Sequence, residues 1–127
     1  MKFLSNEWIE TAKNIASVKL DPEKDLKRIT TSLLNIIENI PPNGKTAYFY
    51  ISVNNGKICE MLINHKENLV VNKSEFVVIG NYDTFIQIFK GEMKTLVAQI
   101  KNRLIVRGDK VKALKFVNQI DRLISCL

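Results

Sequence analysis

The segment that decides the fold is residues 74–116, which read SEFVVIGNYDTFIQIFKGEMKTLVAQIKNRLIVRGDKVKALKF. The β-branched run at 76–79 is typical of a buried strand. Asn81 is positioned to cap a helix that follows directly, with Phe85, Ile88 and Phe89 on one face. Gly91 predicts the end of that helix, because glycine tolerates the left-handed conformation of a helix C-terminus.

A second helix and a strand–helix pair follow Gly91. Leu96, Val97 and Ile100 recur at three- and four-residue spacing, which predicts a short helix with one apolar face. Residues 104–106 predict a short strand that Gly108 closes. Asp109 is placed to cap a final helix. The apolar stripe of that helix comprises Val111, Leu114, Val117, Ile120 and Ile124.

The region before this segment predicts a hairpin of two strands. Residues 48–53 alternate, with Phe49, Ile51 and Val53 on one face, and residues 58–64 alternate again. Between them lies Asn54-Asn55-Gly56-Lys57, a good hairpin turn because asparagine and glycine accept positive φ. A further short strand is expected at 69–71.

The N-terminal part of the chain predicts two helices. Residues 6–19 place Trp8, Ile9, Ala12, Ile15 and Ala16 on one face, with Ser5 or Asn6 as cap. Asp21-Pro22-Glu23 resembles a strong helix start, and we expect that helix to continue to Ile40, where Pro41-Pro42-Asn43-Gly44 stops it.

These elements predict an α+β fold with a mainly antiparallel sheet of about five strands, covered by helices on one face. At 127 residues the chain is expected to form a single domain. Residues 1–40 are its helical N-terminal part, and residues 46–127 supply the core sheet and helices.

Composition points to a cytoplasmic protein. No apolar run approaches the roughly 20 residues needed to span a bilayer, and residues 1–4 lead at once into polar sequence without a signal peptide. Cys59 and Cys126 are far apart and have no metal-like spacing, so two reduced thiols are expected. Ser125-Cys126-Leu127 lacks the basic residue of the Ser-Lys-Leu peroxisomal address.

The sequence offers no set of catalytic or cofactor-binding residues. His65 is the only histidine, and it lies in a predicted polar turn without a nucleophile or an orienting carboxylate beside it. The five glycines are isolated, so no phosphate-binding loop is present. We expect a protein that is not an enzyme and that needs neither a metal nor a cofactor.

The positive charge is concentrated in one segment. Of 19 basic and 13 acidic residues in the chain, eight basic and two acidic residues lie in 90–115, and the remaining eleven of each sign balance. These basic residues could be the solvated sides of helices, contacts to anionic lipid or a membrane surface, or contacts to nucleic-acid phosphates. Nucleic acid is the least expected partner, since the nearby phenylalanines lie on apolar helix faces and not on a stacking strand.

The order of these elements resembles the sterol carrier protein (type-two, non-specific lipid-transfer) domain family, in a standalone microbial form. The resemblance rests on Phe85 to Gly91, on the run from Arg103 to Asp109, and more loosely on the hairpin around 48–57. Asn102 stands where the family often has glycine, and asparagine can take the same left-handed conformation.

The resemblance implies non-catalytic carriage of a fatty acid, acyl-CoA, isoprenoid or other lipid in an apolar cavity between sheet and helices. An accessory domain that dimerises or presents lipid-like substrates to a partner enzyme is the alternative. From sequence alone, the apolar residues could equally be plain core. The expected head-group or anionic-surface contacts are Lys90, Lys94, Lys101, Arg103 and Arg107. The expected cavity lining is Phe49, Ile51, Val53, Met61, Ile63, Phe85, Ile88, Phe89, Met93, Leu96, Val97, Ile100 and Phe116.

Overall fold

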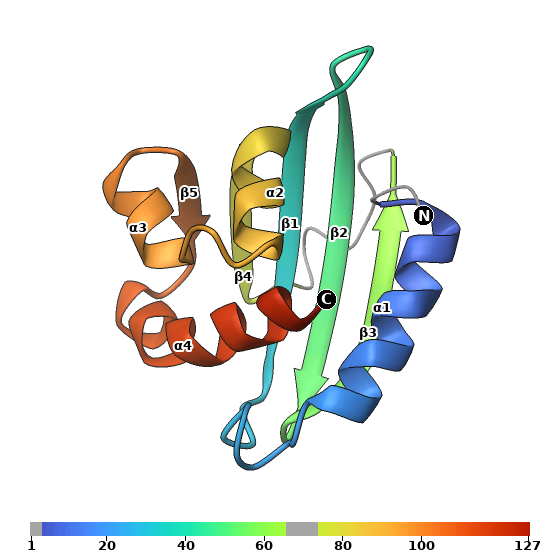
Figure 1. Cartoon of the computed structure of the whole chain (residues 1–127). Coiled ribbons are helices and arrows are strands. Elements are labelled where there is room, and N and C mark those ends of the chain that lie inside the picture. The colour runs from blue at the N-terminus through green and yellow to red at the C-terminus, as the bar shows by residue number, and fades with distance from the viewer. Residues whose placement is uncertain (1–3, 66–73) are drawn as a thin grey trace.

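The computed structural model describes residues 4–65 and 74–127 of the chain (Figure 1). The strand predicted at 69–71 lies outside the described residues. In chain order the elements are α1 (Asn6–Lys19), β1 (Thr31–Ile40), β2 (Lys45–Asn54), β3 (Lys57–Asn64), β4 (Phe76–Asn81), α2 (Tyr82–Phe89), α3 (Thr95–Ile100), β5 (Leu104–Arg107) and α4 (Lys110–Cys126).

Within the described residues, the strands form one five-stranded sheet in the order β3-β2-β1-β4-β5. β1 and β4 are parallel, whereas the other neighbouring strands are antiparallel. The helices lie over one face of the sheet, which Figure 1 shows from the helix side. The predicted α+β architecture with a mainly antiparallel sheet is confirmed.

The helix predicted over residues 21–40 is wrong, and so is an entirely helical N-terminal part. β1 occupies the centre of the sheet between β2 and β4. The neighbours Leu33 and Leu34 point to opposite faces of the sheet, yet each is only 1% exposed. Burial of both faces removes the alternation that marks a strand, and Leu33, Ile36 and Ile40 happen to fall at the three- and four-residue spacing of a helix.

The helix-start signal at Asp21 forms only a short turn. The Asp21 carboxylate accepts hydrogen bonds of 2.8 Å from the backbone N–H groups of Glu23 and Lys24. The turn ends at Lys27 and Arg28, which have φ values of +50° and +52° and therefore leave the right-handed helical region. The chain then enters β1.

The other predicted elements within the described residues lie where the sequence places them, although the Asn81 side chain forms no capping hydrogen bond to α2. Asn55 and Gly56 adopt φ values of +52° and +81° in the β2–β3 hairpin turn. Asn102 has a φ of +59°, so it replaces a glycine conformationally as expected. The Asp109 side chain caps α4 by accepting a 3.1 Å hydrogen bond from the backbone N–H of Lys112.

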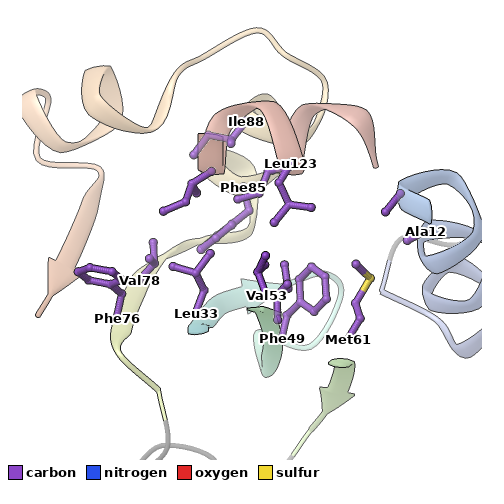
Figure 2. Close-up of a cluster of buried hydrophobic side chains, with 14 of the residues drawn as sticks. Ala12, Leu33, Phe49, Val53, Met61, Phe76, Val78, Phe85, Ile88 and Leu123 are labelled. Atoms are coloured by element: carbon purple, nitrogen blue, oxygen red, sulfur yellow. The ribbon is translucent and has the colours of Figure 1, made fainter. Parts of the chain in front are cut away.

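The main core lies between the sheet and the helices (Figure 2). Beside it, the rings of the partly buried Trp8 from α1 and Phe89 from α2 and of the buried Phe49 from β2 lie with centroids 5.5 to 6.2 Å apart. Such aromatic contacts add to the free energy of apolar burial. The cluster holds α1 and α2 against the same face of the sheet.

Candidate ligand-binding groove

An apolar groove of about 580 Å³ runs between helix α1 and strand β3. We call it the α1–β3 groove. The wall on the helix side comprises Lys13, Ala16, Ser17 and Leu20. Residues 57–62 form the wall on the strand side. Pro22, Leu26 and Gly56 form one end of the groove.

The groove arises from the sheet edge and from small side chains. Among the residues that the structure describes, β3 is the outermost strand of the sheet, and α1 packs beside it (Figure 1). Ala16 and Ser17 face it from α1 and leave space that a larger residue would fill. Leu26 and Met61 are no more than 1% exposed and supply an apolar floor.

Polar groups are confined to a few positions along the groove. Lys13 lies on the helix wall and forms a 3.3 Å ion pair with Glu10. Lys57 and Glu60 are exposed on the strand wall. Cys59, an exposed free thiol on the same wall, contacts the Lys57 carbonyl oxygen at 3.6 Å. This arrangement suits an alkyl chain with a polar end near the lysines.

A smaller groove of about 310 Å³ lies between α3, β5 and α4. We call it the α3–α4 groove. Unlike the first groove, it is lined by aliphatic residues that are strongly exposed, with Ile100 73% and Leu114 59% exposed. Its lining residues are Leu96, Gln99, Ile100, Val106, Gly108, Lys110, Ala113, Leu114 and Val117.

The thirteen residues expected to line one cavity occupy several different places. Six of them are no more than 3% exposed and pack in the main core: Phe49, Ile51, Val53, Met61, Phe85 and Ile88. Another four are partly buried and pack against that core: Ile63, Phe89, Met93 and Phe116. Met61 also borders the α1–β3 groove, Leu96 and Ile100 line the α3–α4 groove, and Val97 is 39% exposed.

The five expected head-group residues are also divided. Lys90, Lys94 and Lys101 are exposed. The Arg103 guanidinium instead points back to α2, where it donates hydrogen bonds to Thr84 Oγ1 at 3.2 Å and Gln87 Oε1 at 3.0 Å. Arg107 lies opposite Val77 in the β4–β5 strand register. Its side chain points to the sheet face opposite to that of its neighbour Val106.

The helix wall of the α1–β3 groove was not among the residues predicted from the sequence to line a cavity. The available signal was the pairing of small residues, Ala16 and Ser17, with Leu20 near the end of an amphipathic helix. That signal could be recognised only once β3 was known to lie beside α1, because residues 13–20 and 57–62 are far apart in sequence.

The residues that the structure describes hold no group of three or more metal-ligating side chains and no helix long and apolar enough to cross a membrane. No protein-family model matches the chain, and no curated protein matches its sequence.

The comparison with solved structures is informative at the level of the fold. A crystal structure of sterol carrier protein 2 superposes with a TM-score of 0.80 at 15% identity, over 98% of this chain and 96% of that one. The solution structure of palmitated SCP2L2 from Aedes aegypti gives a TM-score of 0.58 at 14% identity, over 91% and 89% of the two chains. This chain therefore has the sterol carrier protein 2 fold.

The same fold matches part of a much larger enzyme. The inverting sec-alkylsulfatase Pisa1 from Pseudomonas sp. gives a TM-score of 0.54 at 18% identity, over 80% of this chain but only 14% of the enzyme. The fold resemblance predicted from the sequence is confirmed.

Proposed function

We propose that the protein binds and carries a hydrophobic ligand without covalent chemistry and that the ligand lies in the α1–β3 groove. The observation that carries the proposal is an apolar groove of about 580 Å³ with a buried aliphatic floor. Its volume falls in the range of about 300–1,000 Å³ that is usual for small-molecule sites. A structure with this fold is described as palmitated, which supports an acyl ligand.

The expected ligand is a fatty acid or the acyl chain of an acyl-CoA. Lys13 and Lys57 lie on opposite walls, so an anionic end group can approach either ammonium while the chain rests on Leu26 and Met61. An uncharged isoprenoid would use the same floor without the lysines. We therefore expect anionic ligands to bind more tightly than neutral ones of equal length.

The free energy available is moderate. Each buried methylene contributes about 0.8 kcal/mol, so ten contribute about 8 kcal/mol. Association and ordering costs of at least about 4 kcal/mol oppose this gain. Ten buried methylenes therefore leave at most about 4 kcal/mol of binding free energy, which corresponds to a dissociation constant of about 1 mM or weaker. A longer buried chain binds more tightly, and binding of this strength allows a carrier to release its ligand.

Native mass spectrometry tests the proposed function. The protein is sprayed as isolated and after addition of an equimolar mixture of palmitate, palmitoyl-CoA, farnesol and cholesterol. A one-to-one adduct with palmitate or palmitoyl-CoA is expected. A folded protein that takes up none of the four ligands would exclude carriage.

An accessory role is the second candidate, and the alkylsulfatase match favours it because this fold there forms one part of an enzyme. In that role the domain would dimerise or present a lipid-like substrate to a partner enzyme. A dimer in the same mass spectrum, without any lipid adduct, would support this role over carriage.

A further inference from the structure

Helices α3 and α4 present a row of exposed aliphatic side chains. Ile100 is 73% exposed, Val111 74% and Leu114 59%. Ile100 and Leu114 line the α3–α4 groove together, and Val111 lies one turn before Leu114 on α4. Clustered exposed aliphatics of this size indicate an interaction surface.

Lysines accompany these aliphatic residues at helical spacing. Val97 and Lys101, Lys110 and Leu114, and Val111 and Lys115 are each four residues apart. On a helix such residues lie on the same side, one turn from each other. Lys101, Lys110 and Lys115 are all exposed.

The charge of this surface is not neutralised locally. Asp109 is occupied as the cap of α4, and Glu75 pairs with Lys112 at 2.5 Å. Within the described part of the chain, no ion pair engages Lys101, Lys110 or Lys115. The segment 90–115 carries the entire net charge of +6, since the rest of the chain balances.

We infer that this surface docks on an anionic phospholipid bilayer. Ile100, Val111 and Leu114 enter the interfacial region, and the lysines contact head-group phosphates, as is typical of basic amphipathic elements that lie on membranes. We call these six residues, Ile100, Lys101, Lys110, Val111, Leu114 and Lys115, the docking surface. It lies apart from the α1–β3 groove and does not depend on what that groove holds.

Charge and apolarity together favour a bilayer over other partners. A second copy would bring one +6 segment against another, which is unfavourable. Nucleic acid would satisfy the lysines but leave the three aliphatic side chains without an apolar partner. An anionic bilayer satisfies both kinds of side chain.

Vesicle flotation tests the inference with the full chain. We expect the protein to float with phosphatidylcholine vesicles that contain about 30 mol% phosphatidylserine and to remain unbound with phosphatidylcholine alone. Raising the salt from about 0.1 M to about 1 M shortens the Debye length from about 10 Å to about 3 Å, so it should release the protein.

Two triple variants separate the aliphatic and the charged contributions. I100S/V111S/L114S keeps every charge, and K101Q/K110Q/K115Q keeps every aliphatic residue. Each is expected to lower vesicle affinity at least about tenfold. The matched control is V18S, because Val18 is 84% exposed on α1, outside the docking surface. It should bind vesicles as the unaltered protein does.

Other results would overturn the inference. These are equal binding to neutral and anionic vesicles, no binding of the unaltered protein to anionic vesicles, or flotation of the serine variant at the level of V18S. Near-UV circular dichroism and palmitate binding of each variant report whether the fold persists. A different result would show that the surface binds a second copy of the chain. In that case the unaltered protein would not bind vesicles and would sediment as a dimer, whereas the serine variant would sediment as a monomer.

Discussion

Gly56 in the β2–β3 turn packs directly against Pro22 in the turn that follows α1. A Cβ atom at position 56 would lie 2.3 Å from the Pro22 carbonyl oxygen. In addition, the Gly56 N–H donates a 2.8 Å hydrogen bond to the carbonyl oxygen of Ile29. This contact joins the hairpin to the N-terminal segment and forms one end of the α1–β3 groove.

Substitution of Gly56 by alanine should therefore destabilise the fold strongly. The left-handed φ of +81° costs a side chain about 1–2 kcal/mol, and the clash with Pro22 adds about 1–3 kcal/mol. The free energy of unfolding, measured by urea titration, should fall by the sum of the two.

Gly44 provides the matched control for that experiment. Its φ is +69°, but a Cβ there would meet nothing within 4 Å. The free energy of unfolding of G44A should fall only by the cost of the left-handed φ, about 1–2 kcal/mol. Equal losses in G44A and G56A would contradict the close packing against Pro22.

The two free cysteines should differ in reactivity. Cys59 is exposed on the groove wall, whereas Cys126 is half-buried and burial raises the pKa of its thiol, which lowers its thiolate fraction. In the folded protein at neutral pH, a disulfide reagent should react with Cys59 first. C59S should retain only the slow phase, and C126S only the fast phase.

Ligand binding should slow the fast phase. An acyl chain in the α1–β3 groove covers Cys59 but leaves Cys126 unchanged, so saturating palmitate should protect one thiol selectively. Equal protection of both thiols, or of neither, would place the ligand elsewhere.

The ionised Glu75 carboxylate should contribute to the free energy of unfolding, and this contribution should be lost in acid. Burial alone would raise the pKa of its carboxyl, but hydrogen bonds from Lys112 and from the Thr31 hydroxyl at 2.6 Å outweigh burial and hold the pKa below its ordinary value of 4.5. A depressed folded-state pKa means stabilisation that is complete above pH 4.5 and disappears as the pH falls through the folded-state value.

E75Q tests that term by urea unfolding across pH. At pH 7 it should lose about 0.5–1 kcal/mol of unfolding free energy, because the pair is partly exposed to solvent. The difference from the unaltered protein should narrow as the pH falls below about 4.5. If the difference in unfolding free energy stayed constant down to pH 2, the contact between Glu75 and Lys112 would not depend on the negative charge of Glu75.

The sequence predicted several element boundaries correctly from the chemistry of their turn or cap residues, although the helix-start signal at Asp21 was misleading. Gly91, Asn102 and Asp109 each mark a boundary through backbone preferences that hold in any fold. β1 was missed because Leu33 and Leu34 are both buried, so no alternation distinguishes the strand from a helix.

The candidate site was less predictable for a different reason. Whether an apolar side chain lines a groove or fills the core depends on what lies opposite it in space. Phe49 and Met61 read alike in sequence and are both buried, yet Phe49 packs against Trp8 and Phe89 while Met61 also borders the α1–β3 groove.

The most direct test of the central claim compares palmitate affinity in two tryptophan variants of α1. Ser17 lines the α1–β3 groove, and its neighbour Val18 is 84% exposed outside it. Isothermal titration of the unaltered protein, S17W and V18W should show that S17W weakens palmitate binding at least about tenfold, since the indole occupies the volume of several methylenes. V18W should bind as the unaltered protein does. Equal palmitate affinity in S17W and V18W, with both folded, would contradict a ligand site in this groove.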